Sequence, residues 1–192
     1  PEDSLNAIQK TKVTAQAMQL YNEIYMPYPF RDEKYGHAQC SFGGAMEHQT
    51  MSFMGNFNFI TVVHELAHHW FGDFITCGSW HDIWLNEAFA TYSEAIACEH
   101  GIGTISQLEW LNIKIQQVTQ QHDGSVYVED ISTVPNIFDY RLTYAKSALV
   151  LHSLRWEIGD EAFFQAIKNY LNDPMLADNF ATTDDLKAHF EA

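Results

Sequence analysis

The chain is poor in cysteine, in basic residues and in long apolar runs, and each shortage argues against a class of protein. Its 192 residues include 3 cysteines that form no CxxC pair, which indicates free thiols rather than a disulfide framework or a thiolate metal site. One disulfide beside one free thiol stays open. Only 10 basic residues face 25 acidic ones, and the resulting formal charge of -15 argues against any nucleic-acid partner. No apolar run reaches the roughly 18 residues of a transmembrane helix.

The remaining composition is that of a globular protein with a large core. Apolar residues make up 46% of the chain and aromatic residues 14%, and no repeat, low-complexity segment or flexible linker interrupts it. We therefore expect one soluble domain spanning residues 1–192. The chain begins at Pro1 rather than at a methionine, so we expect a fragment of a longer protein. The compartment of that protein (cytoplasmic, periplasmic or secreted) stays open.

Periodicity predicts an α+β fold with a small sheet at the front and a mainly helical remainder. Alternating residues predict strands over 35–42 and 50–54, and a third short strand fits the loop over 73–82. A period near 3.6 and the stop signals of proline and glycine predict a series of helices. These helices cover residues 4–25, 59–71, 84–100, 104–118, 139–158, 160–173 and 182–192. We expect residues 134–136 to be a loop and Asp160 to cap the helix that it begins.

The segment His64-Glu65-Leu66-Ala67-His68 is the most informative feature of the chain. On a helix, His64 and His68 share one face, at the spacing that two imidazoles need to bind one metal ion. Glu65 lies on the flank of that face, where it can reach a metal-bound water. The alternative for such a segment is a solvated or internally satisfied helix face. Its apolar flanks argue for burial, where an unpartnered His-Glu-His cluster would be costly.

Glu87 is the candidate third ligand. It follows His68 by nineteen residues and lies within the apolar segment Trp84-Leu85-Asn86-Glu87-Ala88-Phe89-Ala90. Two histidines and one glutamate leave a tetrahedral zinc ion one open position, which is typical of a catalytic site. Glu94, two helical turns after Glu87, is either an acceptor for a ligand histidine or a solvated carboxylate.

These motifs, in this order, resemble those of the gluzincin zinc aminopeptidases, the family of aminopeptidase N and leukotriene hydrolase. The segment 44–48 resembles that family's GAMEN exopeptidase signature, and the segment 144–147 resembles its Tyr-x-Lys-Gly segment. The sequence departs from the family pattern at His48, where the family has Asn, and at Ala88 and Ser147, where Gly is common. The resemblance implies a thermolysin-like catalytic domain without the N-terminal β domain and C-terminal helical domain of the family. Those flanking domains would pack on this one and complete its substrate cleft.

The resemblance also implies a reaction and its residues. One zinc ion per chain would be held by His64, His68 and Glu87. A zinc-bound water would attack the N-terminal peptide bond of a peptide or protein, with Glu65 as general base and Tyr144 as donor to the developing oxyanion.

The GAMEN-like segment would make the enzyme an exopeptidase. Glu47 would bind the free α-ammonium group of the substrate and so place the scissile bond one residue from its end. The substrate-binding residues implied are Gly44, Ala45, Met46 and Glu47. Glycine at positions 43 and 44 would allow close approach of a peptide backbone.

Two other functions remain open from the sequence. One is a zinc hydrolase that acts on an epoxide, as one branch of the family does, although no residue marks a lipid channel. The other is a catalytically silent domain that binds peptide termini. The intact set of candidate catalytic residues favours the aminopeptidase, whose preferred N-terminal residue the sequence does not reveal.

Overall fold

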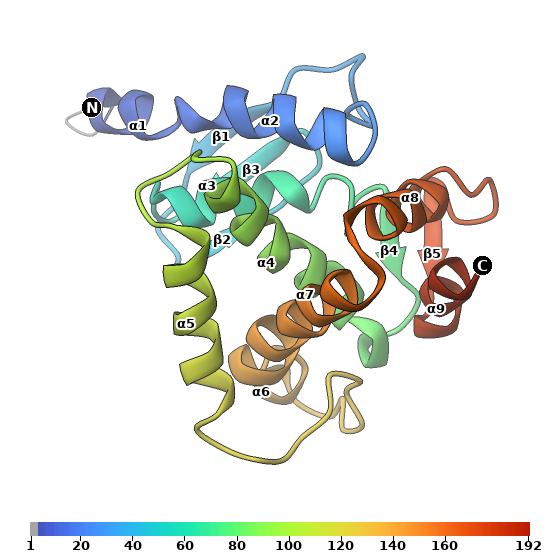
Figure 1. Ribbon diagram of the computed structural model, residues 1–192. Helices are drawn as coiled ribbons and strands as arrows, with labels where there is room; N and C mark the ends of the chain where they lie inside the picture. Colours follow the sequence, from blue (N-terminus) through green and yellow to red (C-terminus); the bar gives the residue numbers. More distant parts are fainter. Residues whose placement is uncertain (1–3) are drawn as a thin grey trace.

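The computed structural model describes residues 4–192 and confirms an α+β fold (Figure 1). Its helices, in chain order, are α1 (Ser4–Lys10), α2 (Val13–Ile24), α3 (Phe59–Ala67), α4 (Trp84–Glu99), α5 (Gln107–Val118), α6 (Val134–Ile137), α7 (Ser147–Ile158), α8 (Asp160–Leu171) and α9 (Thr183–Glu191). Its strands are β1 (Gly36–Gln39), β2 (Ala45–Met46), β3 (Met51–Met54), β4 (Ile75–Cys77) and β5 (Asn179–Ala181). The remaining elements are η1 (Trp80–Asp82), a short 3-10 helix, and η2 (Tyr140–Lys146), a π-helix.

Two small sheets lie at different places in the fold. In the first, β3 is the middle strand, parallel to β1 and antiparallel to β2. In the second, β4 pairs in parallel with β5, although about 100 residues separate their positions in the sequence. The strands over 36–39, 51–54 and 75–77 fall within segments predicted to be extended, whereas β2 and β5 were not predicted. Isolated strands of two or three residues carry too little alternation to be recognised locally.

Helix α4 is the centre of the molecule. Every residue from Trp84 to Cys98 is buried, and α3, α5, α7 and η2 all pack against this helix. In Figure 1 it lies between α3 above and α7 below. Aromatic rings fill the space around it, because Phe89 stacks on Phe71 with centroids 4.3 Å apart and packs against Tyr170 at 6.3 Å. A helix buried on every side presents its polar side chains to the protein interior and not to water.

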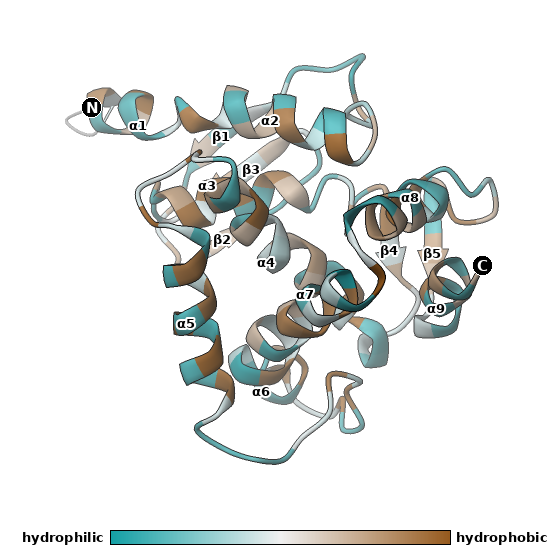
Figure 2. Ribbon diagram, in the orientation of Figure 1, coloured by the Kyte–Doolittle hydropathy of each residue, from teal (hydrophilic) through white to brown (hydrophobic). Residues whose placement is uncertain are grey.

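The outer helices are amphipathic and cover this centre. Figure 2 shows brown and teal alternating along α2 and α5. Ala17, Leu20 and Tyr21 of α2 and Trp110 of α5 face the interior, whereas Leu108 and Ile115 of α5 are exposed. Helices α7 and α8 are tied to α4 by the buried guanidinium of Arg155, which contacts Glu99 at 2.7 Å and Asp160 at 2.8 Å. No helix among residues 4–192 combines the length and the apolar character that crossing a bilayer requires.

Several boundaries differ from the sequence prediction for local reasons. The helix expected over 4–25 is two helices, α1 and α2, because the turn at Thr11 and Lys12 interrupts it. The segment 134–136, predicted to be a loop, forms the single turn α6, because Pro135 suits a first helical turn and Thr133 caps it. The helix predicted over 139–158 is divided into the π-helical η2 and α7.

Helix caps also differ from the prediction. Helix α5 begins after Ser106, whose side chain accepts the N–H of Glu109, and not after Thr104. Asp160 does not cap α8, because its carboxylate binds Arg155 instead. The predicted start of the last helix near residue 182 is confirmed, and Thr182 and Asp185 form a capping box there.

The packing of α8 on α4 yields a stability prediction. Phe163 is fully buried, and its ring meets Tyr92 of α4 edge-on at 5.9 Å. We expect Phe163→Ala to lower the free energy of unfolding by about 3–5 kcal/mol, because it removes apolar contact and leaves a cavity. Urea denaturation followed by circular dichroism measures the change. The matched control is Phe180→Ala, which removes a ring that is 65% exposed and should change stability by less than about 0.5 kcal/mol. Equal effects of the two substitutions would contradict the packing described.

Candidate metal centre

Helix α3 places two histidines on one face. Asn58 caps the helix by accepting the N–H of Thr61, and the buried run from Val62 to Ala67 fixes its orientation against α4. The helix ends at Ala67 rather than at the predicted Phe71, so His68 is its C-cap residue. The N–H of His68 still donates to the carbonyl of His64, and the two imidazoles remain one turn apart.

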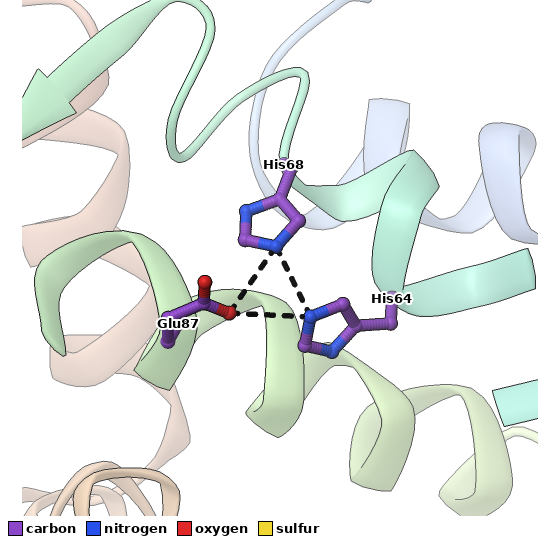
Figure 3. Close-up of side chains that lie close together, drawn as sticks. All are labelled: His64, His68 and Glu87. Carbon is purple, nitrogen blue, oxygen red and sulfur yellow. Dashed lines mark hydrogen bonds and ion pairs between the residues drawn. The ribbon is translucent and has the colours of Figure 1, made fainter. Parts of the chain in front are cut away.

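Both imidazoles are oriented through their Nδ1 atoms. His64 Nδ1 donates to Oε1 of Glu94 at 2.9 Å, and His68 Nδ1 donates to the carbonyl of Phe71 at 3.0 Å. These bonds leave the two Nε2 atoms directed at one point, 3.0 Å apart (Figure 3). Metal-binding histidines in proteins are held in this way, with one ring nitrogen fixed by an acceptor and the other free for the metal. The structure therefore resolves the alternative left open for Glu94, which is a buried acceptor and not a solvated carboxylate.

Glu87 of α4 completes the cluster. Its Oε2 lies 3.3 Å from Nε2 of His64 and 3.3 Å from Nε2 of His68, and no hydrogen bond with acceptable geometry satisfies this buried oxygen among the described residues. The three side chains converge from α3 and α4 in Figure 3, and their ligand atoms lie within 4.8 Å of one another. A buried carboxylate oxygen without a donor is costly, and a cation bound between it and the two imidazoles would remove that cost. The donor set of two imidazoles and one carboxylate fits zinc.

A second group of acidic side chains lies beside the first. Glu47, next to β2, and Glu65 of α3 lie with His68 in a set whose ligand atoms are also within 4.8 Å of one another. Burial, opposed by the nearby histidines, raises the pKa of the Glu65 carboxyl to about 7. A carboxyl group with a pKa near neutrality can both accept and release a proton.

Tyr144 of η2 faces His64 from the other side. The two rings are nearly parallel, with centroids 6.2 Å apart. Burial and the neighbouring charge of Glu87 raise the pKa of the Tyr144 phenol well above its ordinary value, so the hydroxyl keeps its proton and can donate a hydrogen bond. Tyr144 also stacks on Tyr140, with centroids 5.5 Å apart.

One cleft of about 950 Å³ contains all these groups. It is lined by all nine residues that the sequence predicted for the site: Gly44, Ala45, Met46, Glu47, His64, Glu65, His68, Glu87 and Tyr144. The structure thus brings the predicted residues together, while their individual roles stay predictions. His48 does not line the cleft, and its ring packs edge-on against Phe53 at 4.8 Å.

Sequence reasoning missed other contributors. The apolar side chains of Trp80 and Ile83, just before α4, and of Phe138, which is distant in sequence, line the same cleft, and no local pattern reveals that these two segments meet. It also missed Lys114 of α5, whose amine lies 3.4 Å from Oε2 of Glu94. A signal for Lys114 did exist, because it follows Trp110 by one helical turn and therefore shares the buried face of α5.

Comparison with known proteins gives consistent results. The sequence model described as "Peptidase family M1 domain" matches residues 54–192. Aminopeptidase N of Streptomyces lividans is 40% identical over 120 residues, which are 57% of this chain and 14% of that protein. Aminopeptidase N of Lactobacillus delbrueckii is 28% identical over 184 residues, 83% of this chain and 22% of that protein. The chain therefore spans less than a quarter of the length of these relatives.

Solved structures agree with this fold. A mutant M1 zinc metallopeptidase from Deinococcus radiodurans, bound to the substrate Tyr-Ser-Ala, superposes with a TM-score of 0.81 at 28% identity. The match covers 93% of this chain and 40% of that one. Native yeast LTA4 hydrolase has a TM-score of 0.75 at 20% identity over 93% of this chain and 31% of that one, a likeness in fold alone.

The geometry of the cluster predicts one zinc ion per chain. Elemental analysis after dialysis against trace zinc should find about one zinc in the unaltered chain and a large loss in His64→Ala and His68→Ala, because each removes one of three ligands. His122→Ala is the control, since His122 is exposed and lies in a loop. Full zinc content in the His64 and His68 variants, or none in the unaltered chain, would contradict this site.

Proposed function

This chain belongs to peptidase family M1, and we propose that residues 1–192 are the thermolysin-like catalytic domain of a zinc-dependent aminopeptidase. The proposed reaction is hydrolysis of the N-terminal peptide bond of peptides or proteins. Two lines of comparison support a peptide substrate: the relatives are named aminopeptidases, and a similar metallopeptidase structure contains a tripeptide substrate. The N-terminal β domain and C-terminal helical domain of such enzymes are the proposed partners of this domain.

The observation that carries the proposal is the proximity of Glu47 to Glu65 and His68. A hydrolytic zinc site needs a general base and a set of ligands, which Glu65, His64, His68 and Glu87 would supply. Glu47 is a further carboxylate at the same place, and an endopeptidase has no evident use for it. A positively charged α-ammonium group is the substrate feature that this carboxylate would bind. The charge pair would orient the substrate so that only its first peptide bond reaches the catalytic groups.

The chain's own residues would perform the proton transfers. When bound, zinc supplies Lewis-acid activation of water and of the scissile carbonyl. Glu65 would accept a proton from the attacking water and transfer it to the departing amine, consistent with its pKa of about 7. Tyr144, whose phenol stays protonated, would donate a hydrogen bond to the negative charge that develops on the carbonyl oxygen.

Strand β2 would bind the substrate backbone. Among residues 4–192 it pairs with β3 alone, so its other edge would be available to an extended peptide. Gly44 begins this edge with a φ of 84°, a left-handed conformation that favours glycine, and a Cβ there would meet no atom within 4 Å. Gly44 is therefore needed for its backbone conformation and for the access that it leaves open.

The general-base role of Glu65 predicts the effect of a single substitution. Glu65→Gln keeps the side-chain shape but removes the proton acceptor, so hydrolysis of an aminoacyl amide should fall about 10²- to 10⁴-fold. Zinc content should stay near one per chain, because Glu65 is not among the three proposed ligands. Glu157→Gln, an exposed change on α7, is the matched control and should leave activity unaltered. Unchanged hydrolysis by Glu65→Gln would refute the assignment.

The role of Glu47 predicts a loss of selectivity for free N-termini. Glu47→Gln should lower kcat/KM for an aminoacyl amide by about 30-fold or more, which corresponds to about 2 kcal/mol of lost charge pairing. The same substitution should leave the slow hydrolysis of the N-acetylated amide nearly unchanged, because that substrate carries no ammonium group. Parallel losses for both substrates would show that Glu47 does not recognise the amine.

A further inference from the structure

A lysine is buried beside the metal centre, where such a residue is rare. Lys114 lies on the inner face of α5 and is 3% exposed. Its ammonium group lies 5.1 Å from the ring centroids of both Trp110 and Tyr140. A desolvated ammonium group is costly unless it is paired, so the contacts of Lys114 reveal what it stabilises.

On one side, Lys114 contacts the carboxylate that orients a proposed zinc ligand. Its Nζ lies 3.4 Å from Oε2 of Glu94, which also accepts the indole N–H of Trp110 at 2.8 Å. The other oxygen of Glu94 accepts Nδ1–H of His64 at 2.9 Å. Lys114 therefore helps to hold in place the carboxylate that orients His64.

On the other side, Lys114 contacts the segment that carries Tyr144. Its Nζ donates a hydrogen bond to the hydroxyl of Tyr140 at 3.0 Å. The Tyr140 ring stacks on Tyr144 with centroids 5.5 Å apart and an interplanar angle of 22°. Both tyrosines belong to η2, whose π-helical backbone packs against α5 and α4. Tyr140 is half exposed, so packing alone holds its ring weakly. Its hydrogen bond from Lys114 therefore helps to fix the position of the ring.

These contacts form a closed circuit around the catalytic cleft. It runs from His64 through Glu94 to Lys114, then through Tyr140 to Tyr144, whose ring faces His64 again at 6.2 Å. Three elements, α3, α4 and η2, meet in this circuit, and α5 closes it. A lysine that only neutralised Glu94 would have no need of the second contact.

We propose that Lys114 is a positioning residue that holds two parts of the site at once, the zinc ligand His64 through Glu94 and the oxyanion donor Tyr144 through Tyr140. The part that concerns Tyr144 and catalysis rests on the proposed function. The part that concerns His64 predicts only the affinity of the site for zinc. The two parts of the proposal predict different outcomes for substitution of Lys114 and of Tyr140.

The first variant is Lys114→Met, which keeps side-chain length and removes the charge and the hydrogen bond. Zinc affinity, measured with zinc and a competing chromophoric chelator, should fall about 10- to 100-fold, because the acceptor of His64 loses its support. With zinc in saturating excess, kcat for an aminoacyl amide should still be about 10-fold low, with KM changed less than about threefold. Lys187→Met, an exposed change on α9, is the control and should alter neither quantity. A folded Lys114→Met with both quantities within about threefold of wild type would overturn the proposal.

The second variant separates the two halves and guards against misfolding of the first. Tyr140→Phe removes only the hydroxyl that accepts from Lys114 and leaves the ring to stack on Tyr144. We expect kcat to fall severalfold while zinc affinity stays unchanged. In the double variant the two losses of kcat should combine to less than their product, because both substitutions break one contact. Independent, fully multiplicative effects would overturn the coupling, as would a Tyr140→Phe variant with unaltered kcat.

The zinc measurement distinguishes this inference from the proposed function. A wild-type chain that binds zinc but hydrolyses no aminoacyl amide would refute the proposed function. Even then, weakened zinc binding by Lys114→Met would support the link from Lys114 to the metal site, and unchanged binding would overturn it.

Discussion

The structure depends on satisfying the polar side chains of a helix that is buried along its length. Helix α4 carries Asn86, Glu87, Ser93 and Glu94 within the protein interior. Each one without a partner would cost more free energy than an ordinary surface contact provides. Asn86 accepts the backbone N–H of Cys77, which fixes β4, and Ser93 bonds Tyr25 at 2.8 Å, which fixes α2. The surrounding elements are thus held in place by the same groups that they satisfy.

Glu87 and Thr91 are exceptions among the described residues of α4, and the charged one, Glu87, defines the site. One of its oxygens has no hydrogen-bond donor, and the two groups that approach it are imidazole nitrogens of α3. A helix built from apolar residues and satisfied polar groups would be stable without a metal. Because Glu87 is part of this buried helix, the interior of the molecule contains an unpaired carboxylate oxygen that a bound cation would neutralise. Stability and the proposed metal binding therefore meet at one residue, because desolvation raises both the cost of an unpaired carboxylate and the strength of its interaction with a bound cation.

Departures from the family pattern are accommodated by local packing. Ala88 is fully buried next to Glu87, and its methyl group is part of the hydrophobic core. Ser147 begins α7, and its hydroxyl donates to the carbonyl of Thr143 and, at 3.0 Å, to that of Tyr144. These bonds satisfy carbonyls at the junction where the π-helical η2 becomes α7, so a serine there supports the segment that carries Tyr144. His48 packs on Phe53 outside the cleft, so its replacement of the family Asn changes the sheet surface next to Glu47.

The sequence by itself determined which residues form the candidate site and the positions of most helices. Helical spacing placed His64 and His68 on one face, and the apolar context of Glu87 indicated burial, because both signals are local and repeat with the period of the helix. Only the tertiary structure decided which segments meet. The pairing of β4 with β5, the use of Glu94 as an acceptor and the place of Lys114 between Glu94 and Tyr140 all join residues distant in sequence. Such contacts follow from how buried polar groups find partners when the helices pack, and no local pattern encodes that choice.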